Sequence, residues 1–129
     1  MEFEPIPAEL DRIGKIIVDA AFKVHTSLGP GLLEKVYQIC LAHELEKRGL
    51  SVRREVPVDI VYDNIRVADA FRIDLLVNGH VVVETKAEKD HPVFFAQTLT
   101  HIKLSGFRLG FLINFHSVLI KDGIKRIVV

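Results

Sequence analysis

The dipeptide Asn78-Gly79 separates two extended segments, residues 65–77 and 80–87. Asn-Gly is a strong hairpin signal, because both residues readily adopt the left-handed backbone of a tight turn between strands. The two runs are rich in β-branched residues, which favour strands. The sequence therefore predicts a β-hairpin whose returning strand, residues 80–87, is largely buried.

Helical periodicity flanks this hairpin on both sides. Apolar residues recur every three or four positions over residues 8–28, and a Gly-Pro-Gly run ends that helix. A second helix is expected over residues 32–48, with Leu33 among its inward residues. A third is expected over residues 92–105, with Phe95 inward, because it opens with proline and is followed by glycine.

The remaining apolar segments are predicted to be strands. Residues 56–62 alternate apolar and other side chains ahead of the hairpin, and residues 107–115 form an apolar run after the third helix. A last hairpin is expected at the end of the chain, where Asp122-Gly123 would join residues 118–121 to residues 124–129.

The order of these elements predicts an α/β sandwich. Two helices come first, then the hairpin strands, a further helix and the closing strands, which favours a mixed central β-sheet flanked by helices. With 129 residues, the chain is expected to form one domain over residues 1–129, with residues 1–7 as an N-terminal tail.

Charge and composition narrow the functional classes. Lys and Arg total 17, as do Asp and Glu, so the net charge gives no support for tight nonspecific nucleic-acid binding. The single cysteine, Cys40, falls in a helical apolar stripe and is expected in the core, which suits a reducing cytoplasm. No apolar run approaches the ~20 residues that span a bilayer, and the acidic start differs from a signal peptide. We therefore expect a soluble cytoplasmic protein without a membrane segment.

Charged residues interrupt both strands of the predicted hairpin. Glu84 and Lys86 lie in the stretch VVVETKA, and Asp74 lies in FRIDLL. Residues two apart in a strand share a face, so Glu84 and Lys86 project to the same side. A salt-bridged pair on an exposed strand would explain these two alone. Ionised groups in apolar surroundings are otherwise paired or bound to a metal, and the third charge of Asp74 favours such a site.

The register of the hairpin decides whether the two carboxylates share a face. A two-residue loop would place Asp74 opposite Val83 and turn it away from Glu84. A three-residue loop over residues 77–79 would place Asp74 opposite Val82 and diagonal to Glu84, at about 7–8 Å. We therefore predict an odd-length loop or an equivalent bulge.

The residue types at this site favour one class of metal. Two carboxylates with a lysine beside them suit Mg²⁺ better than zinc, which prefers His and Cys ligands. The six histidines are scattered without the spacing of a zinc site. The sequence also contains no glycine-rich phosphate loop and no nucleophile elbow of a serine or cysteine triad.

Three segments resemble a known family. FRID, nine intervening residues and ETK resemble the Asp, Glu-x-Lys core of the PD-(D/E)XK nuclease superfamily. The segment LGPGLLEKVYQICLAHELEKRGL is similar to the region that names the GxxExxY family, through Gly31, Glu34 and Tyr37. Residues 107–129 resemble the closing segment of that family. The resemblance implies a restriction-endonuclease-like fold with its active site at the hairpin.

The resemblance also implies a set of metal ligands. Asp74, Glu84 and Glu34 would hold one or two Mg²⁺, for which Mn²⁺ can substitute, and the backbone carbonyl of Thr85 would be an additional ligand. Glu34 matches a helical Glu that supplies a metal contact in such enzymes. Glu44 falls in the same helical arc and is the alternative, although a bond to a neighbouring Lys or backbone group near the helix end would also explain it, and the resemblance favours Glu34.

Two further catalytic assignments follow from the same resemblance. Lys86 would orient or help to deprotonate the attacking water, and its protonation state is left open. Gln97 matches a Gln that follows the Glu-x-Lys strand in related nucleases. Their usual Tyr four residues later is replaced by His101, which lies one helical turn away and could still reach the edge of the site.

Together these features predict an Mg²⁺-dependent nuclease that hydrolyses phosphodiester bonds in nucleic acid, with DNA as the expected substrate. A noncatalytic module for protein interaction or nucleic-acid binding is the alternative, because fold does not guarantee chemistry. A small-molecule or nucleotide hydrolase with the same metal site is a third hypothesis. A homodimer is expected from the way related folds straddle duplexes.

Overall fold

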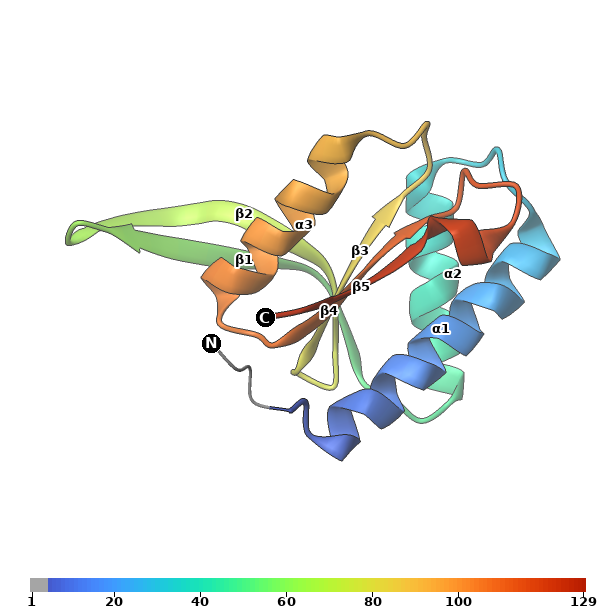
Figure 1. Ribbon diagram of the computed structural model, residues 1–129, viewed down its shortest axis with the longest axis horizontal. Coiled ribbons are helices and arrows are strands. Elements are labelled where there is room, and N and C mark those ends of the chain that lie inside the picture. Colours follow the sequence, from blue (N-terminus) through green and yellow to red (C-terminus); the bar gives the residue numbers. More distant parts are fainter. Residues whose placement is uncertain (1–4) are drawn as a thin grey trace.

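The computed structural model describes residues 5–129 of the chain (Figure 1). Its elements are α1 (Ala8–Leu28), α2 (Glu34–Lys47), β1 (Val52–Tyr62), β2 (Ile65–Val77), β3 (Val81–Lys86), α3 (Pro92–Ser105), β4 (Leu109–Asn114), a 3₁₀ turn η1 (Ile120–Gly123) and β5 (Ile124–Val128). None of the helices in this described part is both long and apolar enough to cross a bilayer.

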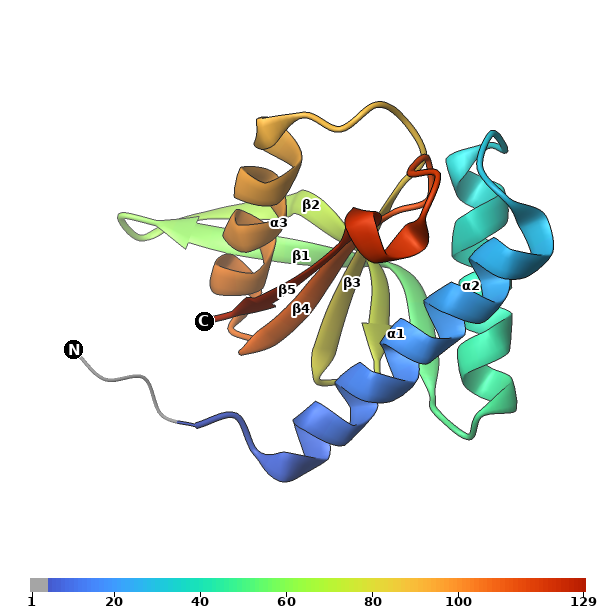
Figure 2. The same cartoon turned by 45° about the vertical axis from the view of Figure 1, so that its right-hand side comes forward.

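The strands form a mixed sheet in the order β1-β2-β3-β4-β5. β3 and β4 run parallel, and the other neighbouring pairs run antiparallel. Helix α3 lies in the crossover between the parallel strands, where a long connection is needed. Figures 1 and 2 show α1 and α2 on one face of the sheet and α3 on the other. The predicted α/β sandwich, a mixed sheet flanked by helices, is therefore confirmed.

Two apolar layers hold the helices against the sheet. Between the sheet and α1 and α2, the largest fully buried side chains are Ile13, Ile17, Tyr37, Leu41, Leu45, Leu75, Leu109, Phe111 and Phe115. Cys40 is partly buried and packs against this layer. Between the sheet and α3, the buried side chains are Val56, Ile73, Leu76, Val82, Phe94, Ile102, Leu112 and Ile127. Each face of the sheet thus has its own helical cover.

Gly110 on β4 determines how closely α3 approaches the sheet. A Cβ atom at this position would lie 2.9 Å from Cγ1 of Ile102 on α3 and 3.1 Å from the backbone oxygen of Val82 on β3. A larger residue would force α3 or the strand to move, because interiors at native packing density have no spare room. The glycine therefore lets α3 lie directly on the central strands.

The predicted bounds of α1 and α3 are confirmed, whereas α2 begins later than expected. Leu33 has an extended backbone at the N-terminal boundary of α2, and its side chain is 77% exposed. The expectation that Leu33 faces inward is therefore wrong. The loop before α2 turns this side chain to solvent, and α2 faces the core only from its second turn onward, with Tyr37 as its first buried residue.

The inward face of α3 also differs from the prediction. Phe95 is 40% exposed, whereas Phe94, Thr98 and Ile102 are buried. These three positions are spaced four residues apart and form a single stripe along a helix. The sequence pattern did not separate Phe94 from Phe95, because both are aromatic and adjacent.

The predicted last hairpin is wrong. Residues 118–121 form no strand, and β4 and β5 pair directly with each other through a connection that contains η1. Ile120 is buried and anchors this connection. Gly123 lies against the backbone carbonyl oxygen of Asn114, where a Cβ atom would not fit. Asp122-Gly123 therefore ends a 3₁₀ turn and does not form the tip of a hairpin.

The β1–β2 hairpin extends beyond the rest of the sheet as an arm (Figure 1). β1 has 11 residues and β2 has 13, whereas β3 has 6. Asp59 stabilises an irregularity in the arm by accepting hydrogen bonds from the backbone N–H of Asp69 at 2.9 Å and from the guanidinium of Arg66 at 2.6 Å. The outer part of the arm is thus held by contacts within the hairpin itself.

Candidate functional site

The loop of the β2–β3 hairpin has three residues. The paired positions are Leu75↔Val83, Leu76↔Val82 and Val77↔Val81. Residues 78–80 therefore form the loop, and Asn78 and Gly79 have positive φ angles of 50° and 69°. The predicted odd-length loop is confirmed, but it lies one residue further along the chain. Continued by one residue, this register brings Asp74 opposite Glu84, where the sequence analysis had expected a diagonal pair.

Asp74 lies just beyond the regular pairing of β2 and β3. Its Oδ2 accepts a hydrogen bond from the backbone N–H of Thr85 at 2.9 Å and one from the Thr85 hydroxyl at 3.2 Å. Because Thr85 is fully buried, these bonds attach the Asp74 carboxylate firmly to β3. Thr85 thus contacts the site through its N–H and hydroxyl, and the ligand role of its carbonyl stays a prediction.

Glu84 is the most deeply buried carboxylate of the site, with 6% of its surface exposed. Burial raises the pKa of Glu84 to about 7, the hydrogen bond with His101 opposes this rise, and the negative charge of Asp74 adds to it. The register of the hairpin places the two residues opposite each other on neighbouring strands. Asp74 and Glu84 therefore form a close acidic pair.

His101 on α3 contacts Glu84 directly. Its Nδ1 lies 2.9 Å from Oε1 of Glu84, and Nδ1–H donates this bond when the carboxylate is ionised. The imidazole of His101 is also stacked on the ring of Phe71 on β2, with 4.2 Å between the ring centroids and 8° between the ring planes. The sequence analysis expected His101 only at the edge of the site and did not identify Phe71.

Lys86 lies on β3 two residues after Glu84. It lines the polar pocket that also contains Asp74 and Glu84, as the strand alternation predicts. Its Nζ lies 4.7 Å from the centroid of the Phe94 ring on α3. A cation at this distance is attracted by the face of the ring, which limits where the flexible side chain can go. The ammonium is therefore held on the α3 side of the sheet, near the acidic pair.

Glu34 is the first residue of α2 and reaches the pocket from the opposite side to α3. Partial burial and the charge of Asp74 raise the pKa of Glu34, while Lys86 lowers it. The alternative residue, Glu44, accepts a hydrogen bond from Arg48 on its own helix at 2.9 Å and lies outside this pocket. The geometry therefore favours Glu34 over Glu44.

Tyr37 fixes the loop that leads to Glu34. Its hydroxyl donates to the carbonyl oxygen of Gly29 at 2.5 Å and accepts from the backbone N–H of Leu32 at 3.0 Å. Its ring is fully buried and stacked on Phe115, with centroids 4.6 Å apart. The spacing of Glu34 and Tyr37 thus has a structural explanation, because Tyr37 holds the start of the helix that presents Glu34.

Replacement of Tyr37 by phenylalanine is expected to reduce the free energy of unfolding by about 1–3 kcal/mol. The ring would still fill its place, but the Gly29 carbonyl and the Leu32 N–H would lose their partner. Urea denaturation measures the change, with the exposed Tyr62→Phe as the matched control. Equal stability of the two variants would contradict this role of the hydroxyl.

The residues described above line one polar pocket of about 200 Å³. Its lining residues are Glu34, Arg72, Asp74, Glu84, Lys86, Gln97, Thr98 and His101. All five side chains predicted to be catalytic are therefore brought together, with Gln97 on the exposed side of α3. Sequence analysis missed Arg72 and Thr98. The position of Arg72 two residues before Asp74 on a strand was the one available signal for it.

The donor set fits a hard divalent cation, although the ligands are not gathered as a complete metal centre. Within residues 5–129, no group of three or more His, Cys, Asp or Glu side chains is arranged to hold a metal ion. Asp74 and Glu84 form a close pair. Glu34 lines the same pocket but is not part of this pair. A close carboxylate pair in which one member has a pKa of about 7 offers hard oxygen ligands whose shared proton a cation can replace.

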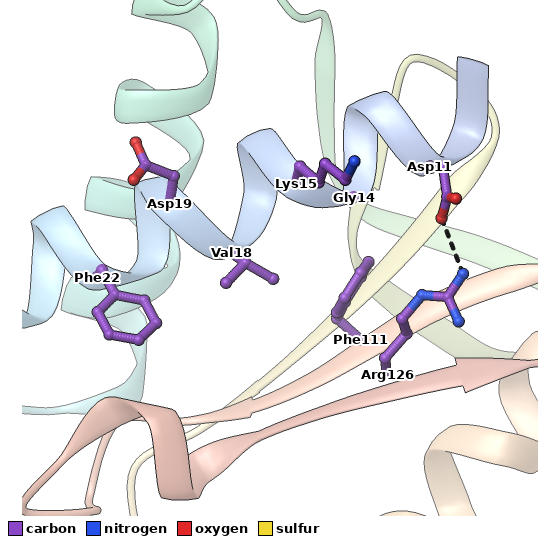
Figure 3. A pocket seen from close by; sticks show the side chains of 8 residues that line it. All are labelled: Asp11, Gly14, Lys15, Val18, Asp19, Phe22, Phe111 and Arg126. Atoms are coloured by element: carbon purple, nitrogen blue, oxygen red, sulfur yellow. Dashed lines mark hydrogen bonds and ion pairs between the residues drawn. The ribbon is translucent and has the colours of Figure 1, made fainter. Parts of the chain in front are cut away.

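A larger hollow of about 540 Å³ lies elsewhere, between α1 and the β4–β5 strands (Figure 3). Phe22, Val18 and Phe111 give it an apolar wall. Of the charged residues that line it, Asp11 is paired with Arg126 at 2.9 Å, Asp19 is paired with Arg48, and Lys15 is the remaining one. It therefore gathers no set of free polar groups comparable to those around Asp74. Size alone does not identify the functional site, and the chemistry favours the smaller pocket.

The comparisons with known proteins agree with this geometry. A family model described as the PD-(D/E)XK nuclease superfamily matches residues 11–127, which include every residue that lines the polar pocket. Neither the curated proteins nor the solved structures gave a significant match. The narrower resemblance to the GxxExxY family stays a prediction. The mixed sheet flanked by helices is consistent with a restriction-endonuclease-like fold, and the chain belongs to the PD-(D/E)XK nuclease superfamily.

Proposed function

We propose that the protein is an Mg²⁺-dependent nuclease that hydrolyses phosphodiester bonds, with DNA as its substrate. The observation that carries this proposal is the meeting of Asp74, Glu84 and Lys86 in one polar pocket. Membership of a superfamily of nucleases, which generally use divalent metals, supports it. A module that only binds a partner has no evident need for a buried carboxylate pair beside a lysine.

In this proposal Asp74 and Glu84 hold the metal, and Glu34 and the carbonyl of Thr85 complete its coordination. A bound Mg²⁺, or Mn²⁺ in its place, would supply Lewis-acid stabilisation of phosphate charge and a water of lowered pKa. Oδ2 of Asp74 is already engaged by Thr85, so Asp74 would offer mainly Oδ1. Glu34 would have to move toward the acidic pair, which its place on the exposed first turn of α2 permits.

Lys86 and Gln97 act on the water and the substrate in the same proposal. Lys86, held near the ring of Phe94, orients the attacking water or helps to deprotonate it, and offsets charge that develops on the phosphate. Gln97 faces the pocket from an exposed turn of α3, where its amide can donate to a phosphate oxygen.

Arg72 is the residue that we expect to bind a phosphate of the substrate. It lines the pocket, is exposed, and has no ion pair or side-chain hydrogen bond with any of residues 5–129. Arg72→Ala is therefore expected to raise KM about tenfold with a smaller change in kcat, since an exposed phosphate contact contributes about 1–2 kcal/mol. Arg53→Ala, an exposed arginine of β1 that lies outside the pocket, is the control in the same kinetic assay.

The experiment that tests the proposal combines metal binding with a cleavage screen. Wild type and Glu84→Ala are titrated with Mg²⁺ and Mn²⁺ by calorimetry, and both are incubated with single-stranded, duplex and branched DNA and with RNA. Metal-dependent cleavage by wild type alone is the expected result. Failure of wild type to bind either metal would overturn the proposal and favour a noncatalytic binding module. Sedimentation with and without duplex tests the homodimer, which stays part of the proposal.

A further inference from the structure

Three side chains from three different elements are in contact one after another, and the last of them belongs to the acidic pair. Phe71 comes from β2, His101 from α3 and Glu84 from β3. The Phe71 and His101 rings are stacked at 4.2 Å, and Nδ1 of His101 lies 2.9 Å from Oε1 of Glu84. Both members of this hydrogen bond are largely buried, with 16% of the His101 side chain and 7% of the Glu84 side chain exposed.

The stacking restricts the imidazole in a way that a hydrogen bond alone would not. The imidazole plane lies within 8° of the Phe71 plane, so the stacking holds the plane of the ring, and the hydrogen bond selects the orientation in which Nδ1 is directed at Oε1. The backbone of His101 is also fixed, because its carbonyl oxygen accepts a hydrogen bond from the Ser105 hydroxyl at 2.5 Å. The donor is therefore held rigidly on one oxygen of Glu84.

This contact makes the two oxygens of the Glu84 carboxylate inequivalent. Oε1 is engaged by His101, which leaves Oε2 as the oxygen available to a ligand in the pocket. A carboxylate bound in this way presents a cation with one oxygen of defined direction. Groups that hold a metal ligand in place are a regular part of metal sites, and their loss typically weakens metal binding about 10–100-fold.

We infer that His101 is a positioning residue for Glu84, with Phe71 as its support, and that by engaging Oε1 it leaves Oε2 as the oxygen that would be free to bind the divalent cation. This inference rests on the proposed function, because it concerns the metal that the nuclease would use. In this inference His101 would bind neither the metal nor the scissile phosphate. Its contribution is the direction of the carboxylate.

Three substitutions separate the hydrogen bond from packing. His101→Phe keeps an aromatic ring against Phe71 but removes the donor. His101→Asn removes the ring but places an amide N–H close to the position of Nδ1. Phe71→Leu keeps the donor and removes the stacked ring. His43→Phe, at an exposed position on α2, is the matched control for the change of residue type.

The primary readout is the Mn²⁺ dissociation constant from calorimetry without nucleic acid, accompanied by thermal unfolding of the metal-free proteins. His101→Phe is expected to weaken Mn²⁺ binding at least about tenfold. His101→Asn is expected to recover most of that loss, even though it packs less well. Phe71→Leu is expected to fall between wild type and His101→Phe, and His43→Phe to match wild type. In the cleavage assay, the metal concentration for half-maximal rate is expected to rise in the same order.

Several results would overturn the inference. One is wild-type Mn²⁺ affinity in a folded His101→Phe protein. Another is a His101→Asn protein that binds Mn²⁺ as poorly as His101→Phe, because the ring and not the donor would then matter. If His101→Phe does not fold, the same judgement is made from His101→Asn and Phe71→Leu, and wild-type affinity in Phe71→Leu counts against the support role. Absence of Mn²⁺ binding by wild type is a different outcome, which removes the proposed function and this inference with it.

Discussion

Glu84→Gln is expected to reduce phosphodiester cleavage by about 10³-fold or more while the protein remains folded. A bound cation supplies several kcal/mol of transition-state stabilisation, and about 1.4 kcal/mol corresponds to a factor of ten in rate. The glutamine has nearly the same shape and can still accept a hydrogen bond from His101, but it carries no charge to hold the cation. The loss should therefore appear in kcat and in calorimetric metal binding together.

The control for this substitution is Glu46→Gln, an exposed position on α2 outside the polar pocket. It removes the same charge from the protein and should leave cleavage and metal binding at wild-type values. Circular dichroism of both variants checks the fold. Substantial cleavage by purified Glu84→Gln would exclude Glu84 as an essential metal ligand.

Glu84→Gln is also expected to be more stable than wild type at alkaline pH when no metal is present. The pKa of Glu84 is raised from 4.5 to about 7, chiefly by burial, so the folded protein holds this proton more tightly than the unfolded chain. Below pH 4.5 both states are protonated and there is no penalty. As the pH rises from 4.5 through 7, the unfolded chain releases this proton while the folded protein still holds it, so about 3 kcal/mol of stability is lost over this interval and the loss levels off above the folded pKa.

Urea unfolding in EDTA at pH 5, 6, 7 and 8 measures this effect. The stability advantage of Glu84→Gln over wild type should grow from pH 5 to pH 8 toward an upper limit of about 3 kcal/mol. Loss of the ionic component of the bond with His101 opposes part of this gain. Parallel stability curves for the two proteins over this range would show that the Glu84 carboxyl is not perturbed by its surroundings.

According to these two expectations, Glu84 lowers the stability of the metal-free protein and is needed for cleavage. The ionised Glu84 carboxylate is unfavourable in the metal-free protein, chiefly because burial removes it from water, and the negative charge of Asp74 adds to the cost. Both effects would be relieved by a bound cation. Active sites commonly contain such groups with perturbed proton affinity.

Local sequence patterns were sufficient to predict the centre of the site. Alternation along a strand places Glu84 and Lys86 on one side, and the Asn78-Gly79 turn identifies the hairpin that brings Asp74 next to them. Both features act over a few residues of contiguous chain. The exact register was missed by one residue, because loops of equal length can start at different residues around the same turn.

The remaining residues depend on how distant elements pack, which no local pattern reports. The contact between His101 and Glu84 requires α3 to lie at one particular position on the sheet, and Phe71 meets His101 only because β2 passes beneath that helix. The choice of Phe94 over Phe95 as the inward residue has the same origin. The last hairpin was mispredicted for a related reason, since β5 gains more from pairing with β4 than from a local turn at Asp122-Gly123.

The position of Gly110 has a consequence for the depth of the pocket. His101 and Gln97 reach the pocket from α3, whereas Glu84 and Lys86 reach it from the sheet, so the separation of these two layers is also the distance across the site. Gly110 limits that separation where the helix rests on β4. A single added methyl group at Gly110 would push α3 away from the sheet. The two sides of the pocket would then move apart, although every residue that lines it stayed the same. A residue outside the lining of the pocket thus controls the distance between its two walls.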